Sequence, residues 1–456
     1  MPWESVTGWC WPQSVAPGGR VALHLSSPGG RPVAVEVARA GRDRTVVRTE
    51  ARIEAEEHAT PADASSRGCG WPAALTIEVD PAWPSGYYEV TLEVEVQGRS
   101  RRDHAFFVVR PAPGAGRRVT TTHPPDPQMA THVGYLRLNH LSAWAGSAGW
   151  PDWELPFVQW AEREGYVLDV ATNADLEDHP DLLSGYRLLL SVGHDEYWSA
   201  PMRDTVEGFI GRGGNVAFLS GNTSFWQVRL EDPSPEGPAA SMVGYKGRFH
   251  DDPAYGTLQQ DRLTTMWSDH LLGRPENAMT GVSFARGGYH RIGKRVTNGA
   301  GGYTVHRPDH WLFEGTGLTY GDVLGGGPTI VGYECDGCDF TYRDGLPHPT
   351  GEDGTPPGFE ILGTAPAAHF TRETATRPPR PDEPSEIEFI ASRLFGERSP
   401  EAVERIAHGH AVLGTWTSPA GGTVVTSGST DWAHGLSGRD PQVEQITRTI
   451  LDRLSR

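Results

Sequence analysis

The sequence contains little cysteine, few basic residues and no long apolar run, and each shortage excludes a class of protein. Four cysteines in 456 residues are too few for a disulfide scaffold. The 40 lysines and arginines are outnumbered by 58 aspartates and glutamates, and the net charge of −18 argues against a nucleic-acid partner. No stretch approaches the roughly 18 apolar residues of a membrane span, so no membrane partner is expected either.

The N-terminal residues and the cysteines are typical of a cytoplasmic protein. MPWESVTGWCWP has neither a basic n-region nor an apolar h-region, so we expect no secretory signal and reduced thiols. Cys335 and Cys338 form a C-x-x-C pattern, which could be half of a zinc site. No second pair follows at a suitable spacing, so the alternative is two incidental thiols in an acidic loop.

Common catalytic signatures are missing as well. The chain has no G-x-S-x-G elbow, no H-E-x-x-H motif and no G-x-x-x-x-G-K-[ST] phosphate loop. The glycines of Gly211–Asn215 lack the Rossmann spacing and end a predicted helix instead of opening one. The chain does contain 37% hydrophobic residues and 15 tryptophans, which is ample for packed cores in two or three domains.

The first 110 residues predict an all-β sandwich. Short apolar runs alternate with Gly and Pro turns, and Tyr87–Val96 follows a strict period of two. Such a domain could bind carbohydrate or simply accompany a catalytic domain. Residues 111–128 are rich in Pro, Gly and Thr without periodicity, and they predict a linker.

Residues 129–456 predict an α/β domain with a mostly parallel sheet and helices on both faces. Strand-like runs at Tyr166–Ala171, Tyr186–Val192 and Asn215–Ser220 alternate with helical patterns at Glu154–Gly165 and Pro201–Gly211. The Gly- and Pro-rich region of about 231–380 is predicted to be an insertion that carries binding loops.

A cluster of chemical groups follows the strand predicted at Tyr186–Val192, and the turn after a strand is a favoured site position in α/β sheets. Because consecutive side chains diverge, we expect His194 and Glu196 to converge and Asp195 to point elsewhere. Imidazole can act as a base or a ligand, and a carboxylate can bind a hard metal. The alternative is that Asp195 or Glu196 caps the helix that begins near Ala200.

Two later segments place further polar groups at strand ends. Asn222 follows the next predicted strand, so it should emerge at the same edge of the sheet as His194. Its amide could stabilise an oxyanion or orient a carbonyl, or it could only accommodate a tight turn. Glu334 follows another apolar run and Asp336 alternates with it, and either could be an ordinary exposed carboxylate.

Weaker candidates lie at both ends of the second domain. Tyr135 and Asn139 leave its first predicted strand, and Tyr135 could equally be a core aromatic residue. Asp431 and His434, in GSTDWAHGL, could line a pocket or stabilise a turn.

Several motifs together resemble the large (beta) subunit family of N,N-dimethylformamidase. They are the run VGHDEYWSAPMRDTVEGFIGRGGNVAFLSGNTSFWQVR, then YKGRFHDDP, LTTMWSDH, VGYECD and GSTDWAHGL, in this order. The resemblance extends from about Thr131 to the C-terminus. It implies a fold similar to class I glutamine amidotransferases without their nucleophilic cysteine.

The resemblance also implies a mononuclear iron held by two tyrosines and a glutamate. Transferred by motif, Glu196 is a metal ligand, and His194, Asn222 and Glu334 surround the substrate. Tyr135 matches one tyrosine. The second has no counterpart: Trp150 or Trp153 could occupy its space, and His132 or His140 could substitute as a ligand.

The sequence therefore predicts a hydrolase of a non-peptide amide C–N bond, metal-assisted and using His and Glu for acid–base catalysis. Its expected partners are a small-molecule amide and either further copies of the chain or a separate small subunit. Two alternatives stay open. One is a lyase or tailoring enzyme of specialised metabolism that uses the same pocket, and the other is a non-catalytic glycan-binding protein.

Overall fold

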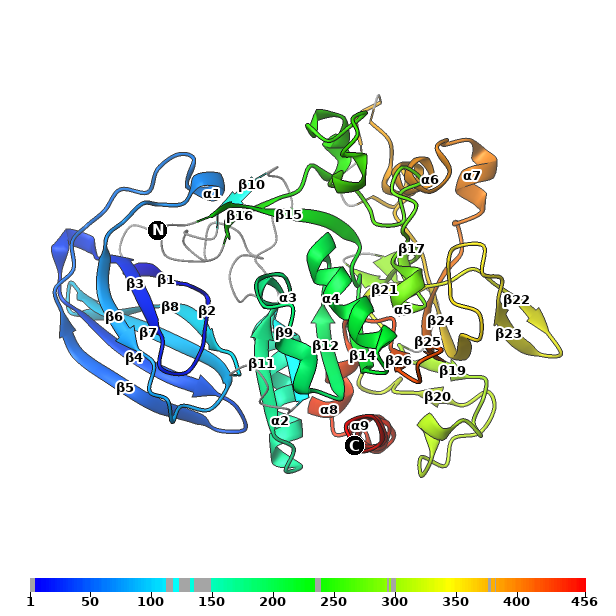
Figure 1. Ribbon diagram of the computed structural model, residues 1–456, viewed down its shortest axis with the longest axis horizontal. Helices are drawn as coiled ribbons and strands as arrows, with labels where there is room; N and C mark the ends of the chain where they lie inside the picture. Colours follow the sequence, from blue (N-terminus) through cyan, green and yellow to red (C-terminus); the bar gives the residue numbers. More distant parts are fainter. Residues whose placement is uncertain are drawn as a thin grey trace. The chain divides into compact units, whose positions relative to one another are not determined.

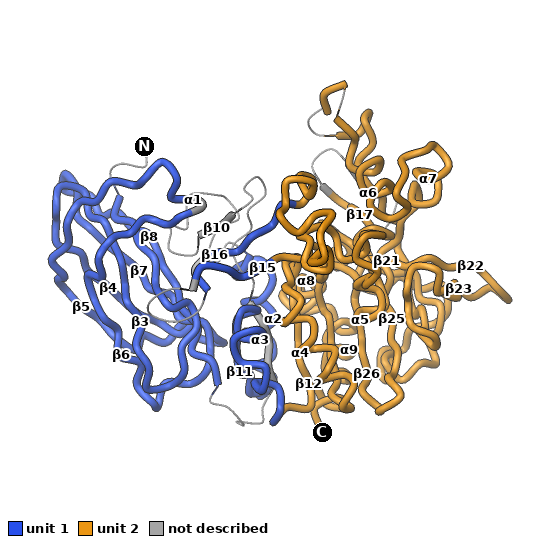
Figure 2. Tube along the Cα trace, turned by 45° about the horizontal axis from the view of Figure 1, so that its top comes forward, with its two compact units in different colours: residues 1–185, 229–245 blue, residues 186–228, 246–456 orange. Residues whose placement is uncertain are grey.

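The computed structural model of the protein describes residues 5–111, 118–122, 132–134, 149–233, 239–292, 295–296, 301–375, 379–381 and 383–456. The chain divides into two compact units (Figure 2). The first comprises residues 1–185 and 229–245, and the second comprises residues 186–228 and 246–456. The predicted domain limits at 110 and 129 stay a prediction, because the structure does not describe 112–117 and 123–131.

Two β-sheets dominate the first unit (Figure 1). The smaller sheet has the order β1-β3-β6, with bounds Thr7–Trp11, Arg20–Ser26 and Ala73–Glu78. The larger has the order β2-β8-β7-β4-β5, with bounds Ser14–Val15, Arg99–Val109, Gly86–Val96, Val33–Ala40 and Arg44–Ile53. Neighbouring strands pair antiparallel, except that β2 is parallel to β8.

The side chains of β7 show how these sheets enclose a core. Val90, Leu92 and Val94 are buried, whereas Thr91 and Glu93 between them are partly exposed, as the period of two requires. The buried set joins apolar residues of the smaller sheet in one cluster. Two sheets that share one core form a sandwich.

The first unit continues with shorter elements. α1 spans Ala64–Arg67, α2 Leu155–Arg163, β11 Leu168–Thr172 and α3 Asn173–Asp178. β9 (Arg118–Thr122) pairs in parallel with β11, and β10 (His132–Gly134) pairs antiparallel with β16 (Ala239–Val243). Arg39 of β4 donates a hydrogen bond to Glu162 of α2 at 2.5 Å, which joins the larger sheet to this helix.

The main sheet of the second unit is mixed. Its strands follow the order β12-β14-β26-β25-β24-β19-β20, with bounds Leu188–His194, Asn215–Gly221, Thr423–Thr426, Gly409–Thr417, Glu360–Ala367, Tyr303–Val305 and Val323–Leu324. β12, β14 and β26 are parallel to one another. The pairs from β26 onward are antiparallel.

The predicted fold class, a mostly parallel amidotransferase-like sheet with helices on both faces, is therefore wrong. The β-α-β pattern was read from the segment that forms β12, α4 (Ala200–Gly211) and β14, where the strands are parallel. Strands from the region 231–380, β19, β20 and β24, extend the sheet with antiparallel pairing. The direction of these strands depends on pairing with residues far along the chain, and a local sequence pattern does not indicate that pairing.

The remaining strands and helices lie between and after the strands of this sheet along the chain. β15 (Trp226–Pro233) pairs in parallel with β13 (Tyr197–Ser199) in the second unit and continues into the first, where it pairs antiparallel with β16. A sheet of order β18-β17-β21 has bounds Arg295–Val296, Ser283–Ile292 and Tyr333–Gly337, and β22 (Phe340–Arg343) forms a hairpin with β23 (Leu346–Pro349). The remaining helices are α5 (Asn277–Thr280), α6 (Glu386–Phe395), α7 (Pro400–Glu404), α8 (Trp432–Ser437) and α9 (Pro441–Leu454). None of the helices formed by the described residues is both long and apolar enough to cross a membrane.

Candidate active site

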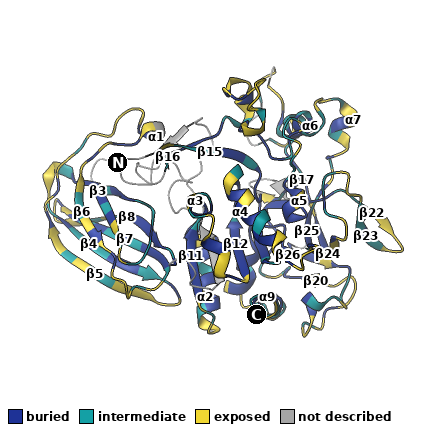
Figure 3. Cartoon of the chain, viewed as in Figure 1, coloured by how far each residue is buried: buried dark blue, intermediate teal, exposed yellow. Residues whose placement is uncertain are grey.

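Polar side chains gather where β12 and β14 end. The two strands run in parallel, so His194, the last residue of β12, lies opposite Gly221, the last residue of β14. Both strands are buried over nearly their whole length (Figure 3). Asn222 is the first residue after β14, and Glu196 is the second residue after β12. The carboxyl ends of adjacent parallel strands therefore bring groups from two distant segments together.

His194 contacts both glutamates of the predicted site. Its Nε2 lies 2.6 Å from Oε2 of Glu334, which comes from β21, and 3.5 Å from Oε2 of Glu196. The three side chains are between 7% and 13% exposed, so their interactions are only weakly screened by water. The structure thus brings His194, Glu196 and Glu334 into one cluster.

Asn222 completes this cluster from the turn after β14. Its Nδ2 donates to Oε2 of Glu334 at 3.0 Å and lies 3.5 Å from Nε2 of His194. The residue is buried and has a φ of 52°, a left-handed conformation that Asn tolerates better than most residues. The preceding Gly221 is packed so tightly that an added Cβ would lie 2.5 Å from backbone atoms of Glu334 and Thr430.

Asp336 holds the backbone of this turn, a role that the sequence alone did not indicate. Its two carboxylate oxygens accept hydrogen bonds from the backbone N–H groups of Asn222, at 2.7 Å, and Thr223, at 3.0 Å. The residue is fully buried, and burial raises its pKa to about 7 although these hydrogen bonds oppose the shift. Its alternation with Glu334 along β21 was the available signal, but an acidic residue in a Gly- and Asp-rich segment reads as exposed.

Asp195 is turned to other partners. It accepts hydrogen bonds from the Ser191 hydroxyl at 2.5 Å and from the Trp198 indole at 2.9 Å. Ser191 also contacts the hydroxyl of Ser220, which in turn contacts that of Thr223. Buried hydroxyls thus connect the turn after β12 with the turn after β14.

Most of the chain matches one known protein family. Residues 34–125 and 116–445 match the model of a family described as N,N-dimethylformamidase beta subunit-like, C-terminal. The chain belongs to this family. The match includes the segments that supply His194, Asn222 and Glu334.

Two similar proteins are named as subunits of N,N-dimethylformamidase. The N,N-dimethylformamidase beta subunit of Alcaligenes sp is 25% identical over 329 residues, which are 66% of this chain and 37% of the relative. That of Paracoccus aminophilus is 26% identical over 328 residues, which are 66% of this chain and 36% of the relative. The matched part of the chain thus spans little more than a third of either relative's length.

A likeness to a solved structure adds nothing to this assignment. Pectate lyase Pel3 from Pectobacterium carotovorum aligns over 48% of this chain and 64% of its own, at 9% identity and a TM-score of 0.14. A score this low does not indicate a shared fold.

The metal ligands implied by the dimethylformamidase resemblance are only partly within the described residues. Glu196 lies in the cluster, whereas Tyr135 and His140 lie outside the described residues, and of His132 only the backbone is described. Within the described ranges, no three His, Cys, Asp or Glu side chains are grouped so that they could hold a metal ion. A metal at Glu196 would therefore need donors from elsewhere in the chain.

The weaker candidates have structural contacts. Asp431 accepts a hydrogen bond from the backbone N–H of Tyr333 at 3.1 Å, and Nδ1 of His434 lies 3.8 Å from the Asp431 carboxylate. Asp431 and His434 therefore support the segment that enters β21. Cys335 and Cys338 are free and buried, and burial raises the pKa of both thiols well above the ordinary value. Trp150 and Trp153 are buried in the first unit, where Trp150 stacks on Tyr87.

Tyr197, the residue after Glu196, has a cationic neighbour. Its hydroxyl accepts a hydrogen bond from Nζ of Lys246, and the same ammonium lies 4.5 Å from the centre of the Tyr197 ring. Lys246 also lies 5.4 Å from the centre of the Trp226 ring. Cation–π contacts of this kind anchor a lysine beside aromatic rings.

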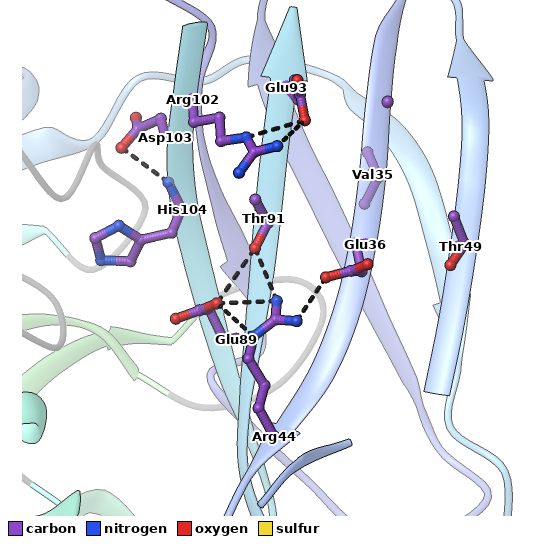
Figure 4. Close-up of a pocket in the computed structure, with 11 residues that line it drawn as sticks. Val35, Glu36, Arg44, Thr49, Glu89, Thr91, Glu93, Arg102, Asp103 and His104 are labelled. Carbon is purple, nitrogen blue, oxygen red and sulfur yellow. Dashed lines mark hydrogen bonds and ion pairs between the residues drawn. The ribbon is translucent and has the colours of Figure 1, made fainter. Parts of the chain in front are cut away.

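A cavity of about 550 Å³ lies on the larger sheet of the first unit and contains none of these residues (Figure 4). Arg44 pairs there with Glu36 at 2.6 Å and Glu89 at 3.1 Å, and Arg102 pairs with Glu93 at 2.9 Å. The lining residues are Ala34, Val35, Glu36, Arg44, Thr49, Glu89, Thr91, Glu93, Arg102, Asp103 and His104. This set contains no aromatic ring of the kind on which sugars stack, so the cavity does not favour the glycan-binding alternative.

Proposed function

We propose that the chain carries the catalytic site of a hydrolase that cleaves an amide C–N bond, with the cluster of His194, Glu196, Asn222 and Glu334 as that site. The observation that carries the proposal is the contact of 2.6 Å between His194 and Glu334 beside the amide of Asn222. The family to which the chain belongs, and the names of its two relatives, support the choice of an amide.

His194 and Glu334 supply acid–base catalysis in this proposal. A histidine can hold or release a proton near neutral pH, and a carboxylate at hydrogen-bond distance fixes the orientation of its ring. The pair takes a proton from water as the water oxygen bonds to the carbonyl carbon. It returns a proton to the nitrogen as the C–N bond breaks, so that the products are a carboxylic acid and an amine.

Asn222 acts beside this pair. Nδ2 carries two N–H groups, and one of them donates to Glu334. The other faces Nε2 of His194 at 3.5 Å and can turn to the substrate, where it would hold the negative charge that develops on the carbonyl oxygen in the transition state. Because Asn222 and His194 lie 3.5 Å apart, one substrate carbonyl can meet both.

We further propose that iron is bound at Glu196 and Tyr135. A bound metal ion would supply a Lewis acid for the carbonyl or for water. Glu196 offers a carboxylate oxygen 3.5 Å from His194, and tyrosine and carboxylate oxygens are donors suited to a hard cation.

Release of dimethylamine from N,N-dimethylformamide, methylamine from N-methylformamide and ammonia from formamide tests the proposed reaction. The wild-type chain should release the amine and the acid in equal amounts. Metal analysis and a visible spectrum of wild type and Glu196→Ala test the metal separately, because tyrosinate bound to ferric iron absorbs visible light. An absence of product from all three amides, both for the chain alone and for the chain with a co-expressed small subunit, would contradict the hydrolase. An unchanged metal content in the variant would contradict the metal ligand.

A separate partner chain is the second part of the proposal. Both relatives are named as beta subunits, which supports assembly with another subunit or with further copies of this chain. Light scattering of the purified chain distinguishes a monomer from a homo-oligomer. If the chain alone releases no amine, the same assay with a co-expressed small subunit decides whether the partner is required.

A further inference from the structure

One strand holds Asn222 at two points. Its side-chain Nδ2 donates to Glu334 at 3.0 Å, and its backbone N–H donates to Asp336 at 2.7 Å. Glu334 and Asp336 are alternate residues of β21, so their side chains leave the same side of that strand. We propose that Asp336 is a positioning residue, which fixes the backbone of Asn222 so that the Asn222 amide meets Glu334 and His194.

The backbone of Asn222 needs such support. Its φ of 52° is unfavourable for a residue with a Cβ. Asp336 compensates by accepting two successive N–H groups of the turn, those of Asn222 and Thr223. Hydrogen bonds to a carboxylate are stronger than those to a neutral acceptor, and here both are buried.

Asp336 is itself firmly placed. Its own N–H donates to the carbonyl oxygen of Gly428 at 3.0 Å, and its side chain has no exposed surface. On the other side of the turn, Gly221 leaves no room for a side chain against Glu334 and Thr430. The position of Asn222 is therefore transmitted from β21 over a short and rigid path.

This inference rests on the proposed function for its catalytic consequence but not for its structural one. In Asp336→Asn, one carboxylate oxygen becomes an amide N–H₂ that cannot accept from the turn. Asp252 offers a matched control, because it is also buried in the second unit and accepts the backbone N–H groups of Ala254 and Thr264 at 3.0 and 2.9 Å. Asp252→Asn should leave the turn of Asn222 unchanged.

Crystal structures of both variants give the first test. In Asp336→Asn we expect Asn222 to leave its positive φ and its Nδ2 to lose contact with Glu334, while Asp252→Asn keeps both. An unchanged Asn222 in Asp336→Asn would overturn the proposal whether or not the protein hydrolyses amides. If Asp336→Asn does not fold, Glu334→Ala replaces it: Asn222 should then keep its φ and both backbone contacts of Asp336 should persist, and their loss would overturn the proposal.

A double-mutant cycle with amine release from N,N-dimethylformamide gives the second test. Asp336→Asn should lower kcat about tenfold or more with little change in KM, since the lost contact acts on the transition state. In an Asn222→Ala background the same substitution should change kcat by less than about twofold, because the two residues act as one unit. Full additivity would show that Asp336 affects turnover independently of Asn222 and would contradict the positioning role. If Asn222 moves in the crystal but wild type releases no amine even with a co-expressed small subunit, the hydrolase proposal fails and the positioning role stands.

Discussion

Nε2 of His194 lies 2.6 Å from Oε2 of Glu334, although 139 residues separate the two positions along the chain. β12 ends at the histidine and β21 carries the glutamate, so the contact depends on two separately formed strands. A carboxylate so close to an imidazole sets the orientation of the ring.

The first prediction concerns this pair. Glu334→Gln keeps the size of the side chain but removes its charge, so His194 loses its anionic partner. We expect kcat for amine release to fall about 10²-fold or more, the range of a general acid–base group. His310 and Glu360 form a similar pair at 3.7 Å elsewhere in the second unit, and Glu360→Gln should leave kcat unchanged. Equal loss in both variants would argue against a special role for Glu334.

The second prediction concerns the close approach at the end of β14. In Gly221→Ala the new Cβ would lie 2.5 Å from backbone atoms of Glu334 and Thr430, so the turn must shift. We expect a loss of about 2 kcal/mol or more in the free energy of unfolding, together with loss of amine release. Gly211, at the end of α4, has open space around its Cα, and Gly211→Ala should stabilise by about 0.5–1 kcal/mol. Urea unfolding followed by circular dichroism measures both.

The third prediction concerns the ion pair between Arg39 and Glu162 in the first unit. Burial opposes ionisation of Glu162, but hydrogen bonds from Arg39 and Arg42 prevail and lower its pKa below 4.5. A carboxyl group with a lowered pKa stabilises the folded state above its unfolded pKa, and this contribution is lost as the pH falls through the folded value. Glu162→Gln should therefore cost about 1–3 kcal/mol at pH 7 and progressively less below pH 4.5. A difference that persists undiminished at pH 3 would contradict this.

The fourth prediction concerns Glu276, which is fully buried beside Ser283. Burial raises its pKa to about 8, so the folded protein binds a proton there that the unfolded chain releases near pH 4.5. Stability contributed by this group is therefore full below pH 4.5 and is lost as the pH rises towards 8. Glu276→Gln should match wild type near pH 4.5 and exceed it in melting temperature at pH 8. The exposed Glu352→Gln, which should follow wild type at both values, is the control.

The fifth prediction concerns the buried ion pair of Asp269 and Arg393. Nε of Arg393 lies 2.7 Å from the fully buried carboxylate of Asp269, and its guanidinium lies 3.9 Å from the centre of the Phe249 ring. Asp269→Asn leaves the guanidinium without its counter-charge and should cost about 3–5 kcal/mol in unfolding free energy. Replacing both residues by Leu and Met should cost less than the single change. A double variant that is worse than Asp269→Asn would contradict an electrostatic origin.

The sequence predicted the elements around β12 better than the sheet as a whole. A buried apolar run, a proline in the first helical turn and a glycine stop are local signals, and α4 and β14 lie where those signals placed them. β24 and β25 give no local sign of their direction, and their antiparallel pairing made the expected mostly parallel sheet wrong. Pairing between distant strands is decided by the whole fold.

The candidate site shows the same division. The divergence of consecutive side chains sufficed to separate Asp195 from its neighbours, and in the structure its partners are Ser191 and Trp198. The burial of Asp336 could not be inferred, because its partners lie 114 and 113 residues earlier in the chain. The predicted ligand Tyr135 lies outside the described residues, so the metal site stays a prediction.

The chain passes between its two units three times, near residues 185, 228 and 245. A single genetic crossover therefore cannot exchange one unit for a homologous one, since any such junction also takes part of the other. Replacing the whole first unit would require a crossover at each of the three junctions, and the second of them lies within β15. We expect the two units to be inherited together in the family.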